Sequence, residues 1–228
     1  MNKPKFNEHY FDVIDTEAKA YFLGLLFADG CVKHYTKGHG GWKTSIELQE
    51  QDGYLLHRLA LEMECPNRVR TAFRKSYNGL GQITHSLEFG YKHLYLTLNN
   101  LGMREGKFNR QNKPIIEERF LSHFYRGYFD GDGAVWQYSN ATAAIGVKIV
   151  GPEGIIDSIR SDFICYYNLA DNTVASLYKE TNSKQPLYKW QIGGKNICHK
   201  FGQFIYQDAT IFLRRKYEIF NQKEVMPS

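Results

Sequence analysis

The sequence predicts an α+β protein built from two copies of one αββαββα unit. The apolar stretch FLGLLFADG at 22–30 returns as YRGYFDGDG at 125–133, and the aspartates before their last glycines, Asp29 and Asp132, are 103 positions apart. The segments LEFGYK and WQIGGK, which end at Lys92 and Lys195, keep the same spacing. A repeat of about 100 residues is too long for a solenoid unit, so it indicates a duplicated domain.

The first copy, residues 1–102, reads as helix, two strands, helix, two strands, helix. Asp15 or Thr16 can cap a helix over the apolar stretch. Strands follow on either side of the turn GHGG, and apolar and polar residues alternate in WKTSIELQE. Pro66 stops the next helix. The second strand pair turns at Asn78-Gly79, and KHLYLTLNNLG forms the closing helix.

The second copy, residues 115–228, repeats this plan after a polar, basic linker at 103–114. Its strands fall near AVWQY, AAIGVKIV, TVASLYKE and PLYKWQIGG, and its last helices cover about 196–221. A linker of about a dozen residues permits the second unit to pack beside the first.

The repeated helices are apolar nearly all round, which predicts burial on several sides. Gly24 and Ala28 are four residues apart, as are Gly127 and Gly131, so each pair lies on one helix face. A face of small residues lets another backbone approach closely. Close packing would offset the cost of about 0.5–1 kcal/mol that a helical glycine carries relative to alanine. We therefore expect the two helices to pack through these faces.

This packing would bring Asp29 and Asp132 together at the ends of their helices. Gly30 and Gly133 are expected to let the chain leave each helix in a left-handed conformation. An acid at a helix C-terminus faces partial negative charge, and two neighbouring acids repel each other. Hard cations with oxygen ligands relieve both effects. The pair therefore predicts a paired-carboxylate site for a hard metal cation.

The second motif contains a further acid, Asp130, whose counterpart in the first copy is Phe27. We interpret Asp130 as a local capping residue. An EF-hand loop over DGDGAVWQYSNA is excluded, because its sixth position is Val135 instead of Gly and its twelfth is Ala141 instead of Glu.

Composition sets broad limits on function. A net charge of +5 permits a polyanionic partner without proving one, and 43% hydrophobic residues suffice for a core. Four cysteines without C-x-x-C spacing argue against a zinc ribbon and suggest reduced thiols. No signal peptide or membrane helix is visible. We expect a protein without a membrane partner that is not secreted, located in the cytoplasm (bacterial or phage-encoded) or in an organelle.

At its two motifs the chain resembles the LAGLIDADG homing endonucleases in their single-chain, two-motif form, and the resemblance covers nearly the whole chain. It implies two antiparallel sheets that form a saddle over double-stranded DNA, with the motif helices between them. It also implies a monomer with a long, specific, asymmetric target. Asp29 and Asp132 would hold Mg²⁺ or Mn²⁺ for hydrolysis of one phosphodiester on each strand, while Gly24 and Gly127 lie where the helices pack.

The resemblance implies further catalytic residues. Lys107 in REGKF and Lys216 in FLRRKYE both resemble the family's supporting lysine. Gln49 and Gln51, in LQEQD, lie near the place where a glutamine often sits. The same place in the second copy reads VGPEG, with no obvious equivalent, so the two halves of the site are expected to be asymmetric.

Basic strand residues are expected to contact DNA. Alternation places Arg68, Arg70 and Arg74 on one strand face, with Ala72 between them. A twisted β-ribbon fits the major groove, where arginine can pair with guanine and lysine can meet phosphates. The other residues expected to contact DNA, from strands or their turns, are Lys33, Tyr35, Lys43, Lys148, Tyr178, Lys179, Lys184, Tyr188 and Lys189.

Two other functions remain open on the same fold: an intron RNA maturase and a DNA-binding protein that does not cleave. The presence of both carboxylates favours a nuclease over the second, and nothing excludes maturase activity alongside cleavage. An intein is disfavoured, because a terminal Asn and flanking splicing blocks are not seen. A two-carboxylate glycosidase is disfavoured by the placement of the acids on packed helices and by the basic strands.

Overall fold

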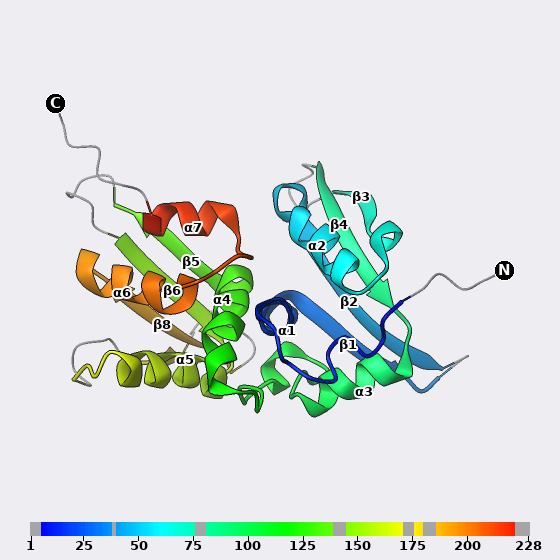
Figure 1. The fold of residues 1–228 in the computed structure, drawn as a ribbon, viewed down its shortest axis with the longest axis horizontal. Coiled ribbons are helices and arrows are strands. Elements are labelled where there is room, and N and C mark those ends of the chain that lie inside the picture. Colours follow the sequence, from blue (N-terminus) through cyan, green and yellow to red (C-terminus); the bar gives the residue numbers. More distant parts are fainter. Residues whose placement is uncertain are drawn as a thin grey trace.

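The structure, a computed structural model, describes residues 6–37, 40–75, 81–138, 145–170, 176–179 and 186–221. Two units lie side by side, each with one sheet, and helices α1 and α4 meet between them (Figure 1). The predicted turn at Asn78-Gly79 and the residues Ala141 and Lys184 lie outside the described residues.

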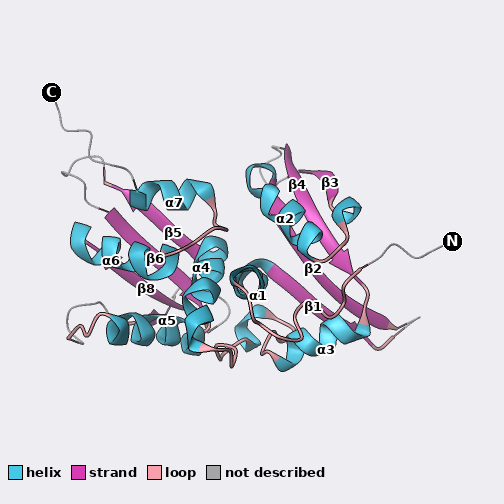
Figure 2. Cartoon of the chain, in the orientation of Figure 1, coloured by secondary structure: helices cyan, strands magenta, loops and turns pink. Residues whose placement is uncertain are grey.

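The first unit contains one antiparallel sheet of order β1-β2-β4-β3 (Figure 2). Its elements are α1 (Glu17–Asp29), β1 (Gly30–Tyr35), β2 (Gly41–Gln49), α2 (Tyr54–Glu62), β3 (Arg70–Lys75), β4 (Gly81–Phe89) and α3 (Lys92–Asn100). Helix α1 begins after Thr16, whose side chain accepts a hydrogen bond from the Lys19 amide. Helices α1, α2 and α3 pack on one face of the sheet, where Ile46 and Leu87 are buried.

The second unit has the corresponding sheet, of order β5-β6-β8-β7. Its elements are α4 (Leu121–Asp132), β5 (Gly133–Gln137), β6 (Ile145–Gly151), α5 (Glu153–Tyr166), β7 (Tyr178–Lys179), β8 (Tyr188–Gly193), α6 (Lys195–Tyr206) and α7 (Arg214–Asn221). In the described ranges no helix is long and apolar enough to cross a membrane.

Strand register preserves the sequence repeat. In the first sheet Gly30 pairs with Ile46, and Ile46 pairs with Leu87. In the second sheet Gly133 pairs with Ile149, which pairs with Trp190, and every partner is shifted by the same 103 positions. The predicted α+β class, with duplicated units, two antiparallel sheets and a central pair of helices, is confirmed.

The two motif helices touch through their backbones. A Cβ atom on Gly24 would stand 2.0 Å from the carbonyl oxygen of Phe124, and one on Gly127 would stand 1.9 Å from that of Tyr21. Both distances are far below van der Waals contact, so only glycine fits at either position. The small-residue faces therefore bring α1 and α4 into direct contact.

A buried ion pair closes the end of this helix pair that is remote from Asp29 and Asp132. Arg126 of α4 is fully buried, and its guanidinium lies 2.6 Å from the Glu17 carboxylate of α1. The same guanidinium donates hydrogen bonds to the carbonyls of Ile205 (3.0 Å) and Ile211 (2.8 Å). The ion pair and the used donors offset part of the cost of burying this charge, and they connect the two units.

The chain leaves both motif helices in an extended conformation, so the expected left-handed exit is wrong. Gly30 has φ −79° and Gly133 has φ −84°. Glycine is required at these two positions because there is no room for a side chain, and not because the backbone is left-handed. A Cβ on Gly30 would lie 2.5 Å from the Leu26 carbonyl oxygen, and one on Gly133 would lie 2.5 Å from that of Phe129. Each helix consequently passes straight into the first strand of its sheet.

Candidate functional site

The carboxylates of Asp29 and Asp132 lie near each other, where α1 and α4 end side by side. A Cβ on Gly131 would be 2.3 Å from the Ala28 Cβ and 2.9 Å from Asp29 Oδ2, so the end of α1 rests on the last turn of α4. The negative charge of Asp29 also helps to raise the pKa of Asp132. The two acids thus form one electrostatic site contributed equally by the two units.

Desolvation by the packed helix ends makes both charges costly, although Asp29 is exposed and Asp132 only half-buried. This desolvation raises the pKa of Asp132 to about 6, against the opposing effect of Lys107 and with a further increase from Asp29. Burial also raises the pKa of Asp29, while Lys107 and Lys216 act in the opposite direction. A carboxylate whose pKa is raised by burial is stabilised by additional positive charge. The site therefore favours a bound cation.

One oxygen of Asp132 is available for such a cation. Lys107 Nζ donates a hydrogen bond to Asp132 Oδ1. The other oxygen, Oδ2, is buried and accepts no hydrogen bond of good geometry among the described residues, although the Tyr128 hydroxyl lies near this carboxylate. A buried, unpaired carboxylate oxygen is destabilising unless a ligand satisfies it. Two carboxylates with a free oxygen are a donor set that suits Mg²⁺ or Mn²⁺.

Lys216 lies behind the acids and binds the end of α4. It is only 3% exposed, and burial lowers its pKa to about 8. Its Nζ donates hydrogen bonds to the carbonyls of Phe129 (2.7 Å), Asp130 (2.8 Å) and Gly133. These are the carbonyls that a helix end leaves unsatisfied. Lys216 acts on the acids through its charge and through the position of the helix end.

Arg110 performs the same task for α1. It is 3% exposed and donates hydrogen bonds to the carbonyls of Leu26 (3.3 Å), Phe27 (2.6 Å) and Gly30 (2.8 Å). Each of these carbonyls lies 103 positions before one that the lysine of the second unit binds. Arg110 is therefore the structural counterpart of Lys216, whereas Lys107 contacts an acid. Sequence reasoning missed Arg110 because a single arginine in a basic linker has no distinctive pattern.

Gln49 and Gln51 lie at the end of β2 and in the 3₁₀ turn that follows it. Both are exposed, and Gln51 Nε2 donates to Gln49 Oε1 at 3.3 Å. The next residue, Asp52, was not anticipated: it is buried, lies 3.3 Å from Arg215, and its charge helps to raise the pKa of Asp29. The repeat places Ile155 at the corresponding point of the second unit, so the site is asymmetric.

Asp130 is buried and accepts hydrogen bonds from three distant parts of the chain, so its interpretation as a local cap is wrong. Its Oδ1 accepts a hydrogen bond from the Tyr206 hydroxyl (2.7 Å). Its Oδ2 accepts from the Tyr21 hydroxyl (2.9 Å) and the Leu213 amide (2.7 Å). Burial raises its pKa, and these hydrogen bonds oppose the shift. The apolar counterpart Phe27 gave no sign of this network, which joins α1, α4, α6 and the segment before α7.

The open face of the first sheet carries five of the basic and aromatic residues expected to contact DNA. Register and alternation place Lys33, Tyr35, Lys43, Arg70 and Arg74 on the side opposite the helices. Two of these charges have acidic neighbours on the same face.

Lys43 Nζ lies 2.6 Å from Glu88, and Arg74 lies 3.0 Å from Glu47. These acids neutralise some of the positive charge on this face. Such a mixed surface suits contacts with particular groups better than attraction to every phosphate.

The second sheet divides its expected residues between two faces. Tyr178 pairs with Lys189, and Lys148 pairs with Gln191, so Lys148, Tyr178 and Lys189 share the open face. Lys179 pairs with Tyr188, and both point to the side that the helices cover. These two residues are therefore not on the face where Lys148 lies.

Arg68 is not part of a strand, so its expected place on one face with Arg70 is wrong. It belongs to a 3₁₀ turn, and β3 begins only at Arg70. Its guanidinium stacks over the rings of Phe6, Phe89 and Tyr91, with centroid distances of 5.2–5.5 Å. Arginine stacked on several rings is held by packing, so Arg68 is a structural residue of the first unit.

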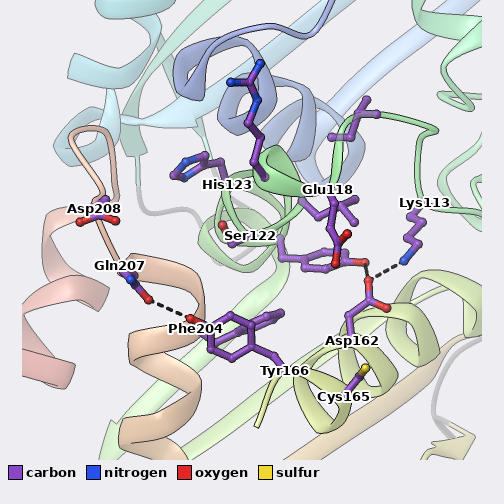
Figure 3. A pocket seen from close by; sticks show the side chains of 14 residues that line it. Lys113, Glu118, Ser122, His123, Asp162, Cys165, Tyr166, Phe204, Gln207 and Asp208 are labelled. Atoms are coloured by element: carbon purple, nitrogen blue, oxygen red, sulfur yellow. Dashed lines mark hydrogen bonds and ion pairs between the residues drawn. The ribbon is translucent and has the colours of Figure 1, made fainter. Parts of the chain in front are cut away.

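A separate pocket of about 730 Å³ lies beside the first half of α4, between α5 and the end of α6 (Figure 3). Inside it, Lys113 Nζ and the Tyr125 hydroxyl both donate to Asp162 Oδ2. Neither Asp29 nor Asp132 lines this pocket, because both stand at the other end of their helices. The paired acids are thus separate from this pocket.

Comparisons with known proteins agree with this geometry. No protein-family model and no curated protein matches the sequence. Solved structures do match its fold. A point mutant of I-SmaMI has a TM-score of 0.54 at 12% identity, over 88% of this chain and 87% of that one.

Two further solved structures contain DNA. I-AabMI, named as a LAGLIDADG meganuclease bound to uncleaved DNA, has a TM-score of 0.52 at 12% identity, over 87% of this chain and 86% of its own. The I-SmaMI LAGLIDADG homing endonuclease bound to cleaved DNA has a TM-score of 0.51 at 12% identity, over 88% and 85%. With its paired motif helices and two open sheets, this chain has the fold of the LAGLIDADG homing endonucleases in their single-chain form.

Proposed function

We propose that this protein is a site-specific endonuclease that acts as a monomer and hydrolyses one phosphodiester on each strand of a long, asymmetric double-stranded DNA target. One observation carries the proposal: two carboxylates, the exposed Asp29 and the half-buried Asp132, stand together where two packed helices pass into the first strands of two open sheets. The likeness to I-AabMI and I-SmaMI, which are named as bound to DNA, supports it.

Asp29 and Asp132 would hold Mg²⁺ or Mn²⁺, since their oxygens are hard ligands and Asp132 Oδ2 accepts no hydrogen bond of good geometry among the described residues. When bound, the metal supplies an activated water and stabilises the leaving oxygen. The protein's part is to fix both carboxylates, one at each helix end, before DNA arrives.

Lys107 supplies positive charge at the surface of the site. Its side chain is 36% exposed, whereas that of Asp132, its partner, is 15% exposed. The ammonium group is therefore accessible to a phosphate that approaches from solvent. A fixed cation of this kind stabilises the negative charge that develops during phosphodiester hydrolysis. Lys216 and Arg110 are positioning residues in this scheme, since their donors are used by helix-end carbonyls.

The two halves of the site offer different charges to the two strands. Lys107 contacts Asp132, while Asp29 has Asp52 and its partner Arg215 nearby. Two scissile phosphates would consequently meet different surroundings, as an asymmetric target requires. The open sheet faces would grip the flanking duplex through lysines, arginines and tyrosines, some reading bases and some meeting phosphates.

Selection of cleaved sites from a randomised or genomic DNA library in the presence of Mg²⁺ tests the proposal. The wild-type protein should enrich one sequence cut on both strands, and Asp29→Asn and Asp132→Asn should still bind that sequence without cutting it. Binding without cutting by the wild type would instead support a DNA-binding protein. Tight binding to intron RNA with no DNA cleavage would support a maturase.

A further inference from the structure

A second group of metal ligands lies on the surface of the first unit, outside the motif helices. His9 Nδ1 is 2.7 Å from Asp12 Oδ2, and His93 Nε2 is 2.7 Å from Asp12 Oδ1. One ligand atom from each of the three residues can be chosen so that all three lie within 4.8 Å of one another. Among the described residues no other group of His, Cys, Asp or Glu converges in this way. Imidazole nitrogen and carboxylate oxygen are ligands that zinc prefers.

The turn that carries His9 and Asp12 is anchored by side chains buried in the core. The residues between them, Tyr10 and Phe11, are buried in the core, at 4% and 1% exposure. The Asp12 amide donates to the His9 carbonyl (3.0 Å), and the His9 amide donates to Asn7 Oδ1 (3.1 Å). Two potential ligands therefore flank two anchored side chains, and their relative position is set before any ion binds.

The third ligand comes from α3, which runs beside the N-terminal segment (Figure 1). His93 lies in the first turn of this helix, whose Leu94 and Leu98 are buried. One turn further on, the Thr97 hydroxyl donates to Asp12 Oδ1 at 3.0 Å. Hydrogen bonds of this kind orient metal ligands and are part of well-built sites. The His9 and His93 rings lie next to each other, with centroids 4.2 Å apart.

We propose that His9, Asp12 and His93 bind one Zn²⁺, which ties the N-terminal segment to α3. Three protein ligands leave the fourth tetrahedral position to water, and the exposure of the cluster allows water to reach it. With zinc–ligand bonds of about 2.0–2.1 Å, tetrahedral ligand atoms stand roughly 3.3 Å apart. The two nitrogen–oxygen contacts of 2.7 Å use different oxygens of Asp12, so the carboxylate must turn to present one oxygen to the ion. Ligand atoms that stand up to 4.8 Å apart must approach each other by about 1.5 Å, which rotation of these side chains provides.

Calorimetric titration with zinc chloride tests the site on the full chain, free of any affinity tag. The Asp29→Asn/Asp132→Asn background removes the paired acids as a competing metal site. We expect one equivalent of zinc to bind this protein. His9→Ala or His93→Ala in the same background should weaken binding by about tenfold or more. Cobalt(II) should give the intense visible absorption of a tetrahedral site, and the histidine variants should lose it.

Thermal unfolding gives a second readout. Zinc that binds only the folded chain should raise the Tm by roughly 5–10 °C at a hundredfold excess over the dissociation constant. The matched control is His57→Ala, because His57 and His85 form another pair of neighbouring rings, 5.6 Å apart, outside the three-ligand cluster. This control should bind zinc like its parent. Absence of binding at millimolar zinc, or histidine variants that bind as tightly as the parent, would overturn the proposal.

Discussion

Lys107 donates a hydrogen bond to the carboxylate of Asp132, although the two residues are 25 positions apart and only the aspartate belongs to a motif helix. The segment that joins the two units thereby supplies a positive charge to the second half of the site. Arg110, three residues further along the same segment, binds the end of the first motif helix. The connecting segment is therefore part of the candidate active site and not merely a tether.

Replacing either acid should remove cleavage. Asp29→Asn or Asp132→Asn eliminates one charged metal ligand, and we expect double-strand cleavage to fall by roughly 10³-fold or more. Affinity for the selected DNA should change little, because the basic residues lie on the open sheet faces. Gel cleavage and binding assays with the same duplex separate the two effects, and normal cutting by either variant would refute the metal-site assignment.

Lys107→Ala should slow cutting of the two strands unequally. The ammonium group contacts Asp132, so the phosphate nearest that acid loses a stabilising charge, and its rate should fall by about 10²-fold. Duplexes labelled on one strand at a time measure each rate separately. Lys107→Arg keeps the charge and serves as the matched control, with partial activity expected. Equal loss on both strands would show that Lys107 serves the whole site.

Lys216→Met and Arg110→Met should destabilise the fold to similar extents. Each substitution leaves buried helix-end carbonyls without donors, at a cost of about 1–3 kcal/mol. For a chain of this size that corresponds to a fall in Tm of roughly 2–12 °C. Thermal unfolding followed by circular dichroism is the measurement. A large loss for one variant with none for the other would contradict their equivalence.

Gly24→Ala should separate the motif helices. Its new methyl group would stand 2.0 Å from the Phe124 carbonyl oxygen, so backbone must move, and overpacking of this kind costs about 1–3 kcal/mol or more. The Tm should fall by several degrees. Gly193→Ala is the matched control, because nothing lies within 4 Å of the added atom. An unchanged Tm for the first variant would mean that the helices do not pack through Gly24.

The repeat made much of this architecture predictable. Equal spacing between the two motifs reappears in the strand register, and the spacing of Gly24 and Gly127 anticipated the close contact of the helices. Both signals are regular spacings of residues, so they can be recognised in a single sequence.

Features specific to one half were harder to predict. Asp130 accepts three hydrogen bonds only because α1, α6 and the segment before α7 each bring one donor to it, and its counterpart Phe27 carries no such signal. The faces of Lys179 and Tyr188 depended on strand register, where a shift of one residue reverses every side chain. Long-range contacts of this kind leave no local trace.

No loop separates α1 from β1, or α4 from β5: Gly30 and Gly133 each begin a strand directly after an acid. Each carboxylate is consequently joined directly to the sheet that would receive the duplex. Any tilt of a sheet as the double helix settles on it would carry the neighbouring acid along. The shape of the seated nucleic acid would then set the separation of the two acids, so a sequence that bends poorly could be held without being cut.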